Sequence, residues 1–445
     1  MGREFDRRAA ILLAGAGLGI AATAFGQEDV RPKVNNPRAT DGDSKFEPDW
    51  DEYLTVTVGN EHADINGKDD KAIQAAVDYV GRIGKGTVHL LPGKFTLRNS
   101  IYLPSRIRLL GSGEDTVVTK FASHSANISE DSDWYDQEIT FEPGHQFRVG
   151  DAVFIQATNS SNGVQENIKR MLVARQGNRF KLNDGLRKNI WLSGKPKGTS
   201  VFPLLTSEFT EDVIIEDLVL DGNGKNNVNM NGNYGGAIFL QDCNRYAIRG
   251  VTTTNYNGDG ISFQICHDVV VENCKSYANA NLGVHPGSGS QRPLIRNNRL
   301  YDNEIGIFWC WGVRYGLAKS NYINNNSNYG ISIGHCDTDN VMVDNDVINS
   351  GKVGILFRDD TRGKDFWANR NVISNNRIIN SGSDNGVAIK LEGQTKDTQV
   401  FGNVIKDDRG AAKRIGIEVS ASVGNVRMQD NKIEGVLTKV VDNRK

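Results

Sequence analysis

The second half of the chain repeats a short pattern of apolar and polar positions. A small residue, glycine in seven of eight places, recurs at intervals of 23, 23, 23, 24, 24, 32 and 30 residues. The first and third positions after it are apolar, and the position between them varies in character. This alternation is typical of a β-strand with one buried face. The strands are expected to start at Ala237, Gly260, Gly283, Gly306, Gly330, Gly354, Gly386 and Gly416.

A second row of polar residues follows the same period. Four asparagines recur at steps of 24 residues, and three more continue the row across the longer repeats: Asn273, Asn297, Asn321, Asn345, Asn376, Asn403 and Asn431. Stacked Asn side chains can hydrogen-bond along the stacking axis, although Asn is also a common turn residue. The regular spacing favours a ladder. With no long helix between the strands, the repeat predicts a parallel β-helix with one continuous apolar core.

The residues before the repeat divide into distinct parts. Residues 1–27 combine Arg7 and Arg8 with a short apolar run, which predicts a signal peptide of the twin-arginine type or an ordinary Sec signal. Residues 28–50 are polar and contain prolines, as expected of a linker. We expect the N-terminal cap and first coils over 51–137, a β-rich insert over 138–205, and the repeats over 206–445. Such an insert could form a wall beside a groove.

A short amphipathic helix is predicted over residues 69–80, with Asp69 or Asp70 as its N-cap. Its apolar face would cover the open end of the coils and protect the exposed strand edges. That face consists of Ile73, Ala76, Val77 and Val80.

Composition excludes some classes of protein. The net charge is −2, so no overall positive field indicates a nucleic-acid partner. Beyond residue 27 no apolar stretch is long enough to cross a bilayer. Together with the predicted signal peptide, this predicts an exported protein in the periplasm or outside the cell. Five cysteines and no CxxC pair argue against a fully paired disulfide framework or a zinc site. Cys243 and Cys266 share one register, and an unoxidised packing row is favoured there over a disulfide.

The region before the repeats also resembles a known family. The helix from Asp69 to Val77, the segment Gly86 to Val88, and Leu91-Pro92-Gly93-Lys94-Phe95 look like the N-terminal cap of the pectate-lyase-like β-helix superfamily. The resemblance implies an all-β, right-handed parallel β-helix. That superfamily contains polysaccharide lyases, glycoside hydrolases, epimerases, esterases and non-enzymatic spikes, so the resemblance does not select a reaction.

Candidate functional residues lie on the outward face of the repeated strand. Aromatic, cationic and acidic side chains gather there in the middle repeats, a mixture that suits sugar binding. His335 and Asp359 occupy equivalent places in neighbouring repeats, so a carboxylate could orient an imidazole. His285 lies in a glycine-rich stretch one repeat from Asp259, although either residue could simply occupy a turn.

Arg358 and Lys390 are expected to share one outward row, where paired cations would suit a substrate carboxylate. The alternative is that they balance nearby acids on a solvated face. Trp311, Arg314 and Gln264 are further candidates for substrate binding, together with Asp360 and Glu392. Four acids, Asp337, Asp339, Asp359 and Asp360, could bind Ca²⁺, although no compact calcium-loop spacing is present. No other cofactor is indicated.

These residues predict an enzyme that acts on a uronic-acid-containing polysaccharide, as a lyase or an epimerase. His285 or His335 would be the base, Arg358 and Lys390 would neutralise the carboxylate, and Tyr315 would be the acid. One alternative is a glycoside hydrolase that uses two carboxylates among Asp259, Asp359, Asp360 and Glu392. Another is a non-catalytic glycan-binding or surface β-helix. The Asp pair, Gly-His-Gly and Arg-x-Lys elements of polygalacturonases and the Asp-Pro-His signature of mannuronan epimerases are absent.

Overall fold

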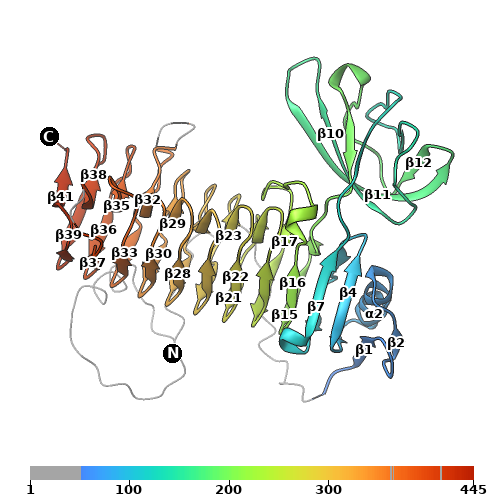
Figure 1. The fold of residues 1–445 in the computed structure, drawn as a ribbon, viewed down its shortest axis with the longest axis horizontal. Helices are drawn as coiled ribbons and strands as arrows, with labels where there is room; N and C mark the ends of the chain where they lie inside the picture. The colour runs from blue at the N-terminus through green and yellow to red at the C-terminus, as the bar shows by residue number, and fades with distance from the viewer. Residues whose placement is uncertain (1–51, 361–362, 364, 411–412, 445) are drawn as a thin grey trace, which may run out of the picture.

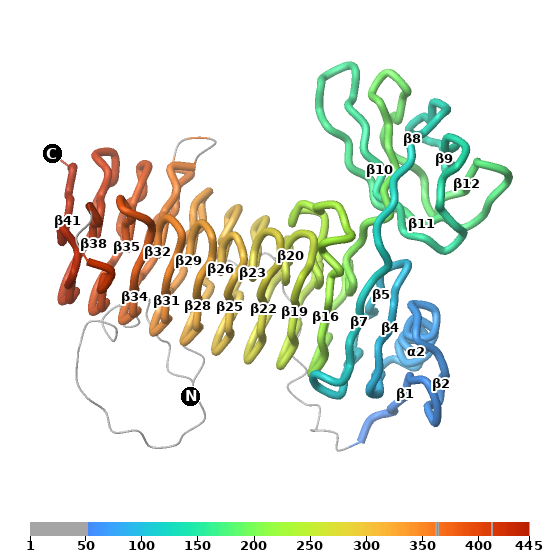
Figure 2. The backbone as a smooth tube through the Cα atoms, viewed as in Figure 1, coloured from blue at the N-terminus to red at the C-terminus, as the bar shows by residue number. Residues whose placement is uncertain are grey.

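The structure is a computed structural model that describes residues 52–360, 363, 365–410 and 413–444 (Figures 1 and 2). The predicted signal peptide and linker, residues 1–27 and 28–50, lie outside the described residues. An elongated stack of coils forms the body, and a separate β-rich unit projects from one side near its N-terminal end. None of the described helices is long and apolar enough to span a membrane.

Three long parallel sheets run along the axis, and each regular coil contributes one strand to each sheet. Sheet C carries the strands whose starts the repeat predicted. Its strands, in spatial order, are β5 (Ile101–Tyr102), β14 (Leu205–Glu208), β17 (Gly236–Gln241), β20 (Asp259–Gln264), β23 (Leu282–Gly287), β26 (Ile305–Phe308), β29 (Tyr329–Ile333), β32 (Val353–Phe357), β35 (Val387–Leu391), β38 (Ile415–Val419) and β41 (Thr438–Asp442).

Sheets A and B complete each coil. Sheet A contains β2 (Ile65–Asn66), β1 (Thr55–Gly59), β3 (Gly86–Leu90), β6 (Ile107–Leu110), β15 (Glu211–Glu216), β18 (Asn244–Arg249), β21 (Val270–Glu272), β24 (Leu294–Arg296), β27 (Leu317–Lys319), β30 (Val341–Val343), β33 (Val372–Ser374), β36 (Thr398–Phe401) and β39 (Val426–Gln429). Sheet B contains β4 (Gly93–Leu97), β7 (Thr116–Lys120), β16 (Val219–Asp221), β19 (Thr252–Thr254), β22 (Lys275–Tyr277), β25 (Arg299–Tyr301), β28 (Tyr322–Asn324), β31 (Asp346–Ile348), β34 (Arg377–Ile379), β37 (Val404–Lys406) and β40 (Lys432–Glu434).

The inward rows of sheet C form one wall of the core. Ile238 pairs with Ile261, and the row continues through Val284, Ile307 and Ile331, all fully buried. Trp309 in the second inward row is also fully buried, as the alternation predicted. Burial of such apolar area stabilises the fold by roughly 25 cal/mol per Å².

The predicted register is wrong in one coil. Leu356 on β32 pairs with Lys390 on β35, and Lys390 pairs with Glu418 on β38. The position equivalent to Gly354 is therefore Ala388 and not Gly386, so Lys390 does not share the row of Arg358. The error spans two residues, and a shift of two leaves every side chain on the same face of a strand. Alternation alone cannot detect such a shift.

The asparagine ladder exists, but two of the predicted members are not in it. Asn273 and Asn297 are exposed and adopt left-handed backbone, with φ of 55° and 56°. The ladder begins one residue later, at Asn298. The backbone amide and the side-chain Nδ2 of each ladder Asn both donate to Oδ1 of the next. The members after Asn298 are Asn321, Asn345, Asn376, Asn403 and Asn431.

The helix α2 (Asp70–Ile83) covers the N-terminal end of the stack, as predicted. Asp69 is its N-cap and accepts a hydrogen bond from the Ala72 amide, and its buried residues are Ile73, Ala76, Val77 and Val80. Three short 3-10 helices lie in connections: η1 (Gly113–Asp115), η2 (Leu192–Gly194) and η3 (Gly224–Asn226).

The projecting unit is a six-stranded sheet whose internal pairs are antiparallel. It begins before residue 138, because its first strand is β8. It has its own small apolar core around Phe141 and Phe180. Its strands are β8 (Ser125–Asn127), β13 (Lys197–Thr199), β10 (Ala152–Thr158), β11 (Gln165–Gln176), β12 (Arg179–Leu182) and β9 (Glu138–Thr140). We call this unit, residues 125–199, the insert.

Candidate functional site

The outward face of sheet C carries a histidine–carboxylate pair at β20 and β23. His285 Nδ1 lies 2.8 Å from Asp259 Oδ2, and the other carboxylate oxygen accepts from the Leu282 amide at 3.3 Å. Asp259 is fully buried and His285 is 4% exposed. A carboxylate at Nδ1 favours the tautomer with its proton on Nδ1 and leaves Nε2 as an acceptor. We call Asp259 and His285 the dyad.

Two polar atoms beside the dyad are buried without a partner. His285 Nε2 and Gln264 Oε1 have no hydrogen-bond partner among the described residues. Gln264 Nε2 donates to Ser262 Oγ at 3.2 Å, and Ser262 Oγ donates to the Gly232 carbonyl at 2.7 Å. Since buried polar groups are nearly always satisfied, these two atoms are acceptors that a bound ligand would find unoccupied.

The segment around Gly232 lies directly over the dyad. A Cβ placed on Gly232 would come within 1.7 Å of Asp259 Oδ2, so glycine is required for this close approach. The same segment reaches the insert, because Tyr234 Oη lies 3.3 Å from Asn167 Nδ2 on β11.

Phe308 joins the dyad to a second cluster of charged side chains. Its ring meets the His285 ring edge-on, with centroids 5.3 Å apart. The guanidinium of Arg358 lies 4.3 Å from the centroid of the same ring and donates to Ser332 Oγ at 2.8 Å. Arg358 also contacts Asp360 at 3.2 Å. These contacts place an imidazole and a guanidinium along one continuous face.

His335 belongs to the second cluster, with a carboxylate partner other than the predicted one. Its Nδ1 lies 2.5 Å from Asp360 Oδ2, whereas Asp359 Oδ1 accepts from Trp367 Nε1 at 3.4 Å. The Trp311 ring stacks on His335 with centroids 4.5 Å apart. We call Trp311, His335, Arg358 and Asp360 the arginine cluster.

The backbone of the arginine cluster is strained. Trp311 has φ of 131° and His335 has φ of 36°, values that bulky side chains rarely adopt. Residues in such conformations cost of the order of 1–3 kcal/mol each and gather at functional sites.

Asp337 supports this turn from below. Its carboxylate accepts from the amides of Val313 at 2.8 Å and Gly334 at 2.9 Å, and lies 4.0 Å from Arg358. Complete burial raises the pKa of Asp337 to about 6, although Arg358 and the amides act in the opposite direction.

Other predicted residues lie apart from these two groups. Lys390 pairs with Glu392 at 2.7 Å and reaches Glu418 at 3.9 Å, and it lies in the row of Phe308 three coils further along the axis. Arg314 donates to Cys336 Sγ at 3.3 Å. Tyr315 lies in the turn that leads into sheet A, where its amide donates to the Thr338 carbonyl at 3.4 Å. The role of Tyr315 as the acid stays a prediction.

The acids proposed for calcium do not converge. Among the described residues no group of three or more His, Cys, Asp or Glu side chains could hold a metal ion. The Asp337 carboxylate already accepts hydrogen bonds from backbone amides. The Asp339 carboxylate accepts two hydrogen bonds from Arg370, at 2.9 and 2.8 Å. All five cysteines are free, and the Cys243 amide donates to Cys266 Sγ at 3.4 Å with no disulfide between the two residues.

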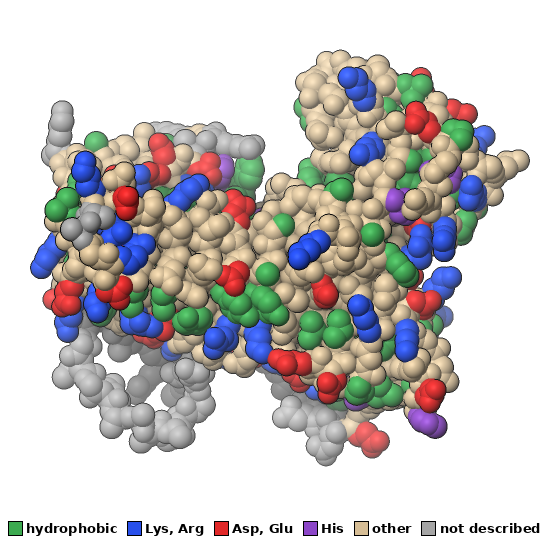
Figure 3. Space-filling view, viewed as in Figure 1, with side chains coloured by type: hydrophobic (Ala, Val, Ile, Leu, Met, Phe, Trp, Pro, Cys, Tyr) green, Lys and Arg blue, Asp and Glu red, His purple; other side chains and the backbone are tan. Residues whose placement is uncertain are grey.

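Between the insert and the first coils lies a cavity that sequence patterns did not indicate. Its volume is about 460 Å³, and it is lined by β11 on one side and by β5, β14 and the second half of β17 on the other. In Figure 3 the upper surface, where sheet C lies in Figure 1, is hollowed beside the insert. Lys169, Glu208 and Phe239 line the cavity, and they come from segments that are distant in the chain.

Comparison with known proteins agrees with the architecture. Residues 218–366 match the family model described as a right handed beta helix region. No curated protein matches the chain. The fold is therefore a right-handed parallel β-helix, as predicted.

Several solved structures share this fold at low sequence identity. The A-module of mannuronan C-5 epimerase AlgE6 of Azotobacter vinelandii is 16% identical with a TM-score of 0.56, covering 83% of this chain and 91% of that one. The AlgE4 A-module of the same organism gives 14% and 0.53, covering 84% and 93%. PfbA, a surface adhesin of Streptococcus pneumoniae, gives 14% and 0.51, covering 87% and 93%. Likeness at this identity shows the fold alone.

Proposed function

We propose that this protein acts on a uronic-acid-containing polysaccharide, as a lyase or an epimerase, along the outward face of sheet C. The observation that carries the proposal is the dyad, with His285 Nε2 buried and unpartnered beside an orphaned Gln264 Oε1. Two of the similar structures are modules of mannuronan C-5 epimerases, which is consistent with this class of substrate.

Both reactions begin with removal of the proton on C5 of a uronate. Asp259 holds the His285 imidazole by Nδ1, so Nε2 is the basic atom and takes the proton. The negative charge that develops on the carboxylate needs a nearby cation. Arg358 shares the Phe308 ring with His285, and we assign this role to it.

Access to His285 follows from the covering segment. Because Gly232 lies against Asp259 and accepts from Ser262, this segment must move when a glycan reaches Nε2. We assign His335 and Asp360 to positioning, since both contact Arg358 or its partner and Trp311 covers His335.

A hydrolase is supported less well. Hydrolysis needs two carboxylates that flank the glycosidic bond. The candidates already have partners: His285 for Asp259, Trp367 for Asp359, Arg358 and His335 for Asp360, and Lys390 for Glu392. A non-catalytic glycan-binding protein is the second candidate, favoured by the likeness to the PfbA adhesin.

The test is turnover of a panel of acidic and neutral polysaccharides. Ultraviolet absorbance of an unsaturated uronide identifies a lyase, exchange of the C5 proton in D₂O without cleavage identifies an epimerase, and new reducing ends alone identify a hydrolase. We expect His285→Gln to lower kcat by about 100-fold or more, the size of a lost general base.

The matched control is His89→Gln. His89 lies on β3 of sheet A, half-buried, with Nε2 3.2 Å from Ser112 Oγ. It should keep wild-type activity. Full activity of His285→Gln would overturn the assignment of the base, and binding of uronates without turnover would favour the adhesin-like alternative.

Export belongs to the same proposal. The pattern of residues 1–27 supports a periplasmic or extracellular location, where polysaccharides are met. Fractionation of cells that carry the full chain, against Arg7→Lys/Arg8→Lys, distinguishes the two export routes, since a twin-arginine signal should fail with paired lysines and a Sec signal should not.

A further inference from the structure

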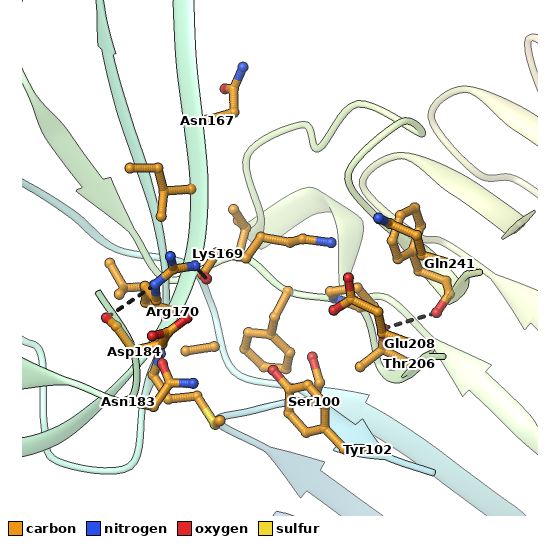
Figure 4. A pocket seen from close by; sticks show the side chains of 18 of the residues that line it. Ser100, Tyr102, Asn167, Lys169, Arg170, Asn183, Asp184, Thr206, Glu208 and Gln241 are labelled. Atoms are coloured by element: carbon orange, nitrogen blue, oxygen red, sulfur yellow. Dashed lines mark hydrogen bonds between the residues drawn. The ribbon is translucent and has the colours of Figure 1, made fainter. Parts of the chain in front are cut away.

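The cavity beside the insert contains a lysine with an unusual environment. Lys169 on β11 extends toward Glu208 and Gln241 (Figure 4). Its Nζ lies 4.2 Å from the centroid of the Phe239 ring. Water reaches the side chain from the cavity, yet the surrounding protein desolvates the ammonium and lowers the pKa of Lys169 to about 8, against the attraction of Glu208.

The other cations of the cavity are already occupied. Arg170 donates to the carbonyls of Gly185 at 3.0 Å and of Leu186 at 3.3 Å. Lys188 pairs with Glu166 at 3.1 Å, and Arg187 lies 3.7 Å from Asp184. Within the described part of the chain, Lys169 is the lining cation with neither a carboxylate within 4.0 Å nor a carbonyl acceptor.

We infer that this cavity is a subsite for one uronate residue of an acidic polysaccharide, with Lys169 binding the sugar carboxylate. The inference rests on the proposed function for its substrate class. A volume of about 460 Å³ lies in the usual range of small-ligand sites. Tyr102, which is 42% exposed, offers an aromatic face, and Glu208 and Gln241 offer acceptors and a donor for hydroxyl groups.

Glu208 also limits the charge of the ligand. A carboxylate facing the same space as Lys169 opposes a dianion such as a phosphate monoester, whereas a single carboxylate is balanced by one ammonium. The lining therefore fits a monoanionic sugar.

The cavity lies in line with the dyad. Phe239, under the Lys169 ammonium, pairs with Ser262, and Ser262 pairs with His285. Neighbouring strands are about 4.8 Å apart, so His285 lies roughly 10 Å along the axis from Phe239. One glycan chain running along sheet C would pass both positions, and the subsite would hold it while His285 meets a neighbouring residue.

The test is calorimetric binding of short oligomannuronates and oligogalacturonates to the full chain and to Lys169→Met, which keeps the length of the side chain and removes its charge. We expect affinity to fall by about tenfold or more in the variant, and carboxyl-reduced oligosaccharides to bind both proteins equally weakly. Lys181→Met is the control, because Lys181 is exposed on β12 and does not line the cavity.

Equal uronate affinity of wild type and Lys169→Met would overturn the inference, as would failure of the wild type to bind any uronate. Tighter binding of sulfated neutral oligosaccharides would refute the choice of carboxylate. Charge-dependent binding without turnover would leave this inference intact while refuting the proposed reaction, so the two failures are distinguishable. Where turnover occurs, Lys169→Met should raise KM and leave kcat near wild type.

Discussion

Replacing Asn298 by alanine tests the asparagine ladder, which lies in the turns between sheets A and B from Asn298 to Asn431. Asn298 is 1% exposed. Its Oδ1 accepts from the Cys274 amide at 2.9 Å, and its Nδ2 donates to the Val271 carbonyl and to Asn321 Oδ1, both at 2.9 Å. Asn298→Ala removes all three bonds.

The cost can be worked out from the groups left behind. Asn321 Oδ1 keeps the Asn298 backbone amide, at 3.1 Å, and the Val271 carbonyl keeps its place in the parallel ladder between β21 and β24, but the buried Cys274 amide loses its acceptor. Each buried polar group without a partner costs about 1–3 kcal/mol. We therefore expect the free energy of unfolding to fall by roughly 1–4 kcal/mol, since the small cavity adds to the cost of the unsatisfied Cys274 amide.

The neighbouring Asn297 provides a matched control. It is exposed and left-handed, with φ of 56°, so Asn297→Gly removes the side chain without straining the backbone. Its effect should stay within about 0.5 kcal/mol. Guanidinium denaturation followed by far-UV circular dichroism and by tryptophan fluorescence measures both variants. If Asn298→Ala were no less stable than Asn297→Gly, the ladder would not be what stabilises these turns.

Two further predictions concern the interior. Asp337 has a pKa of about 6, above its usual 3.8, so the folded state binds its proton more tightly than the unfolded state does. This group's contribution to stability is complete below about pH 4 and is lost as pH rises through 6, a change of up to ~3 kcal/mol. Asp337→Asn should therefore gain stability relative to wild type between pH 4 and pH 7 in guanidinium titrations, and a pH-independent difference would contradict the assignment. For the thiols, a bulky reagent should label the half-buried Cys310 and Cys336 in the native protein, and all five cysteines after unfolding without reductant. Three labelled thiols after unfolding would instead indicate a disulfide between Cys243 and Cys266.

The closeness of Asp259 and His285 could be predicted from the sequence, because strict repeats of 23 residues fix which side chains are neighbours. The interval from Ser262 to His285 is one coil, and Asp259 begins the strand that contains Ser262, so adjacency followed from counting. The pairing of His335 was harder. It depends on side-chain direction in a turn with left-handed backbone, where Asp359 and Asp360 are consecutive and spacing cannot choose between them.

The errors arose where one pattern is compatible with two structures. Asn is suited both to a left-handed turn position and to a ladder, and Asn297 and Asn298 are consecutive, so the 24-residue spacing selected the wrong one. In the coil of β35 the connections are longer, and Gly386 resembled a strand start although it lies in the preceding turn.

The sequence by itself determined the stacked coils, the inward rows and the capping helix, because burial imposes a period on residues that are near one another in the chain. The tertiary structure alone decided the cavity. Lys169 belongs to an antiparallel insert and Phe239 to the parallel stack, and 70 residues separate them. The coils and the insert have separate apolar cores, so no periodic sequence pattern predicts which of their residues are in contact. Those contacts depend on how the two folded units pack against each other. The contacts within the arginine cluster were also decided by the tertiary structure, because its side chains lie in turns, where the strand period does not fix which residues meet.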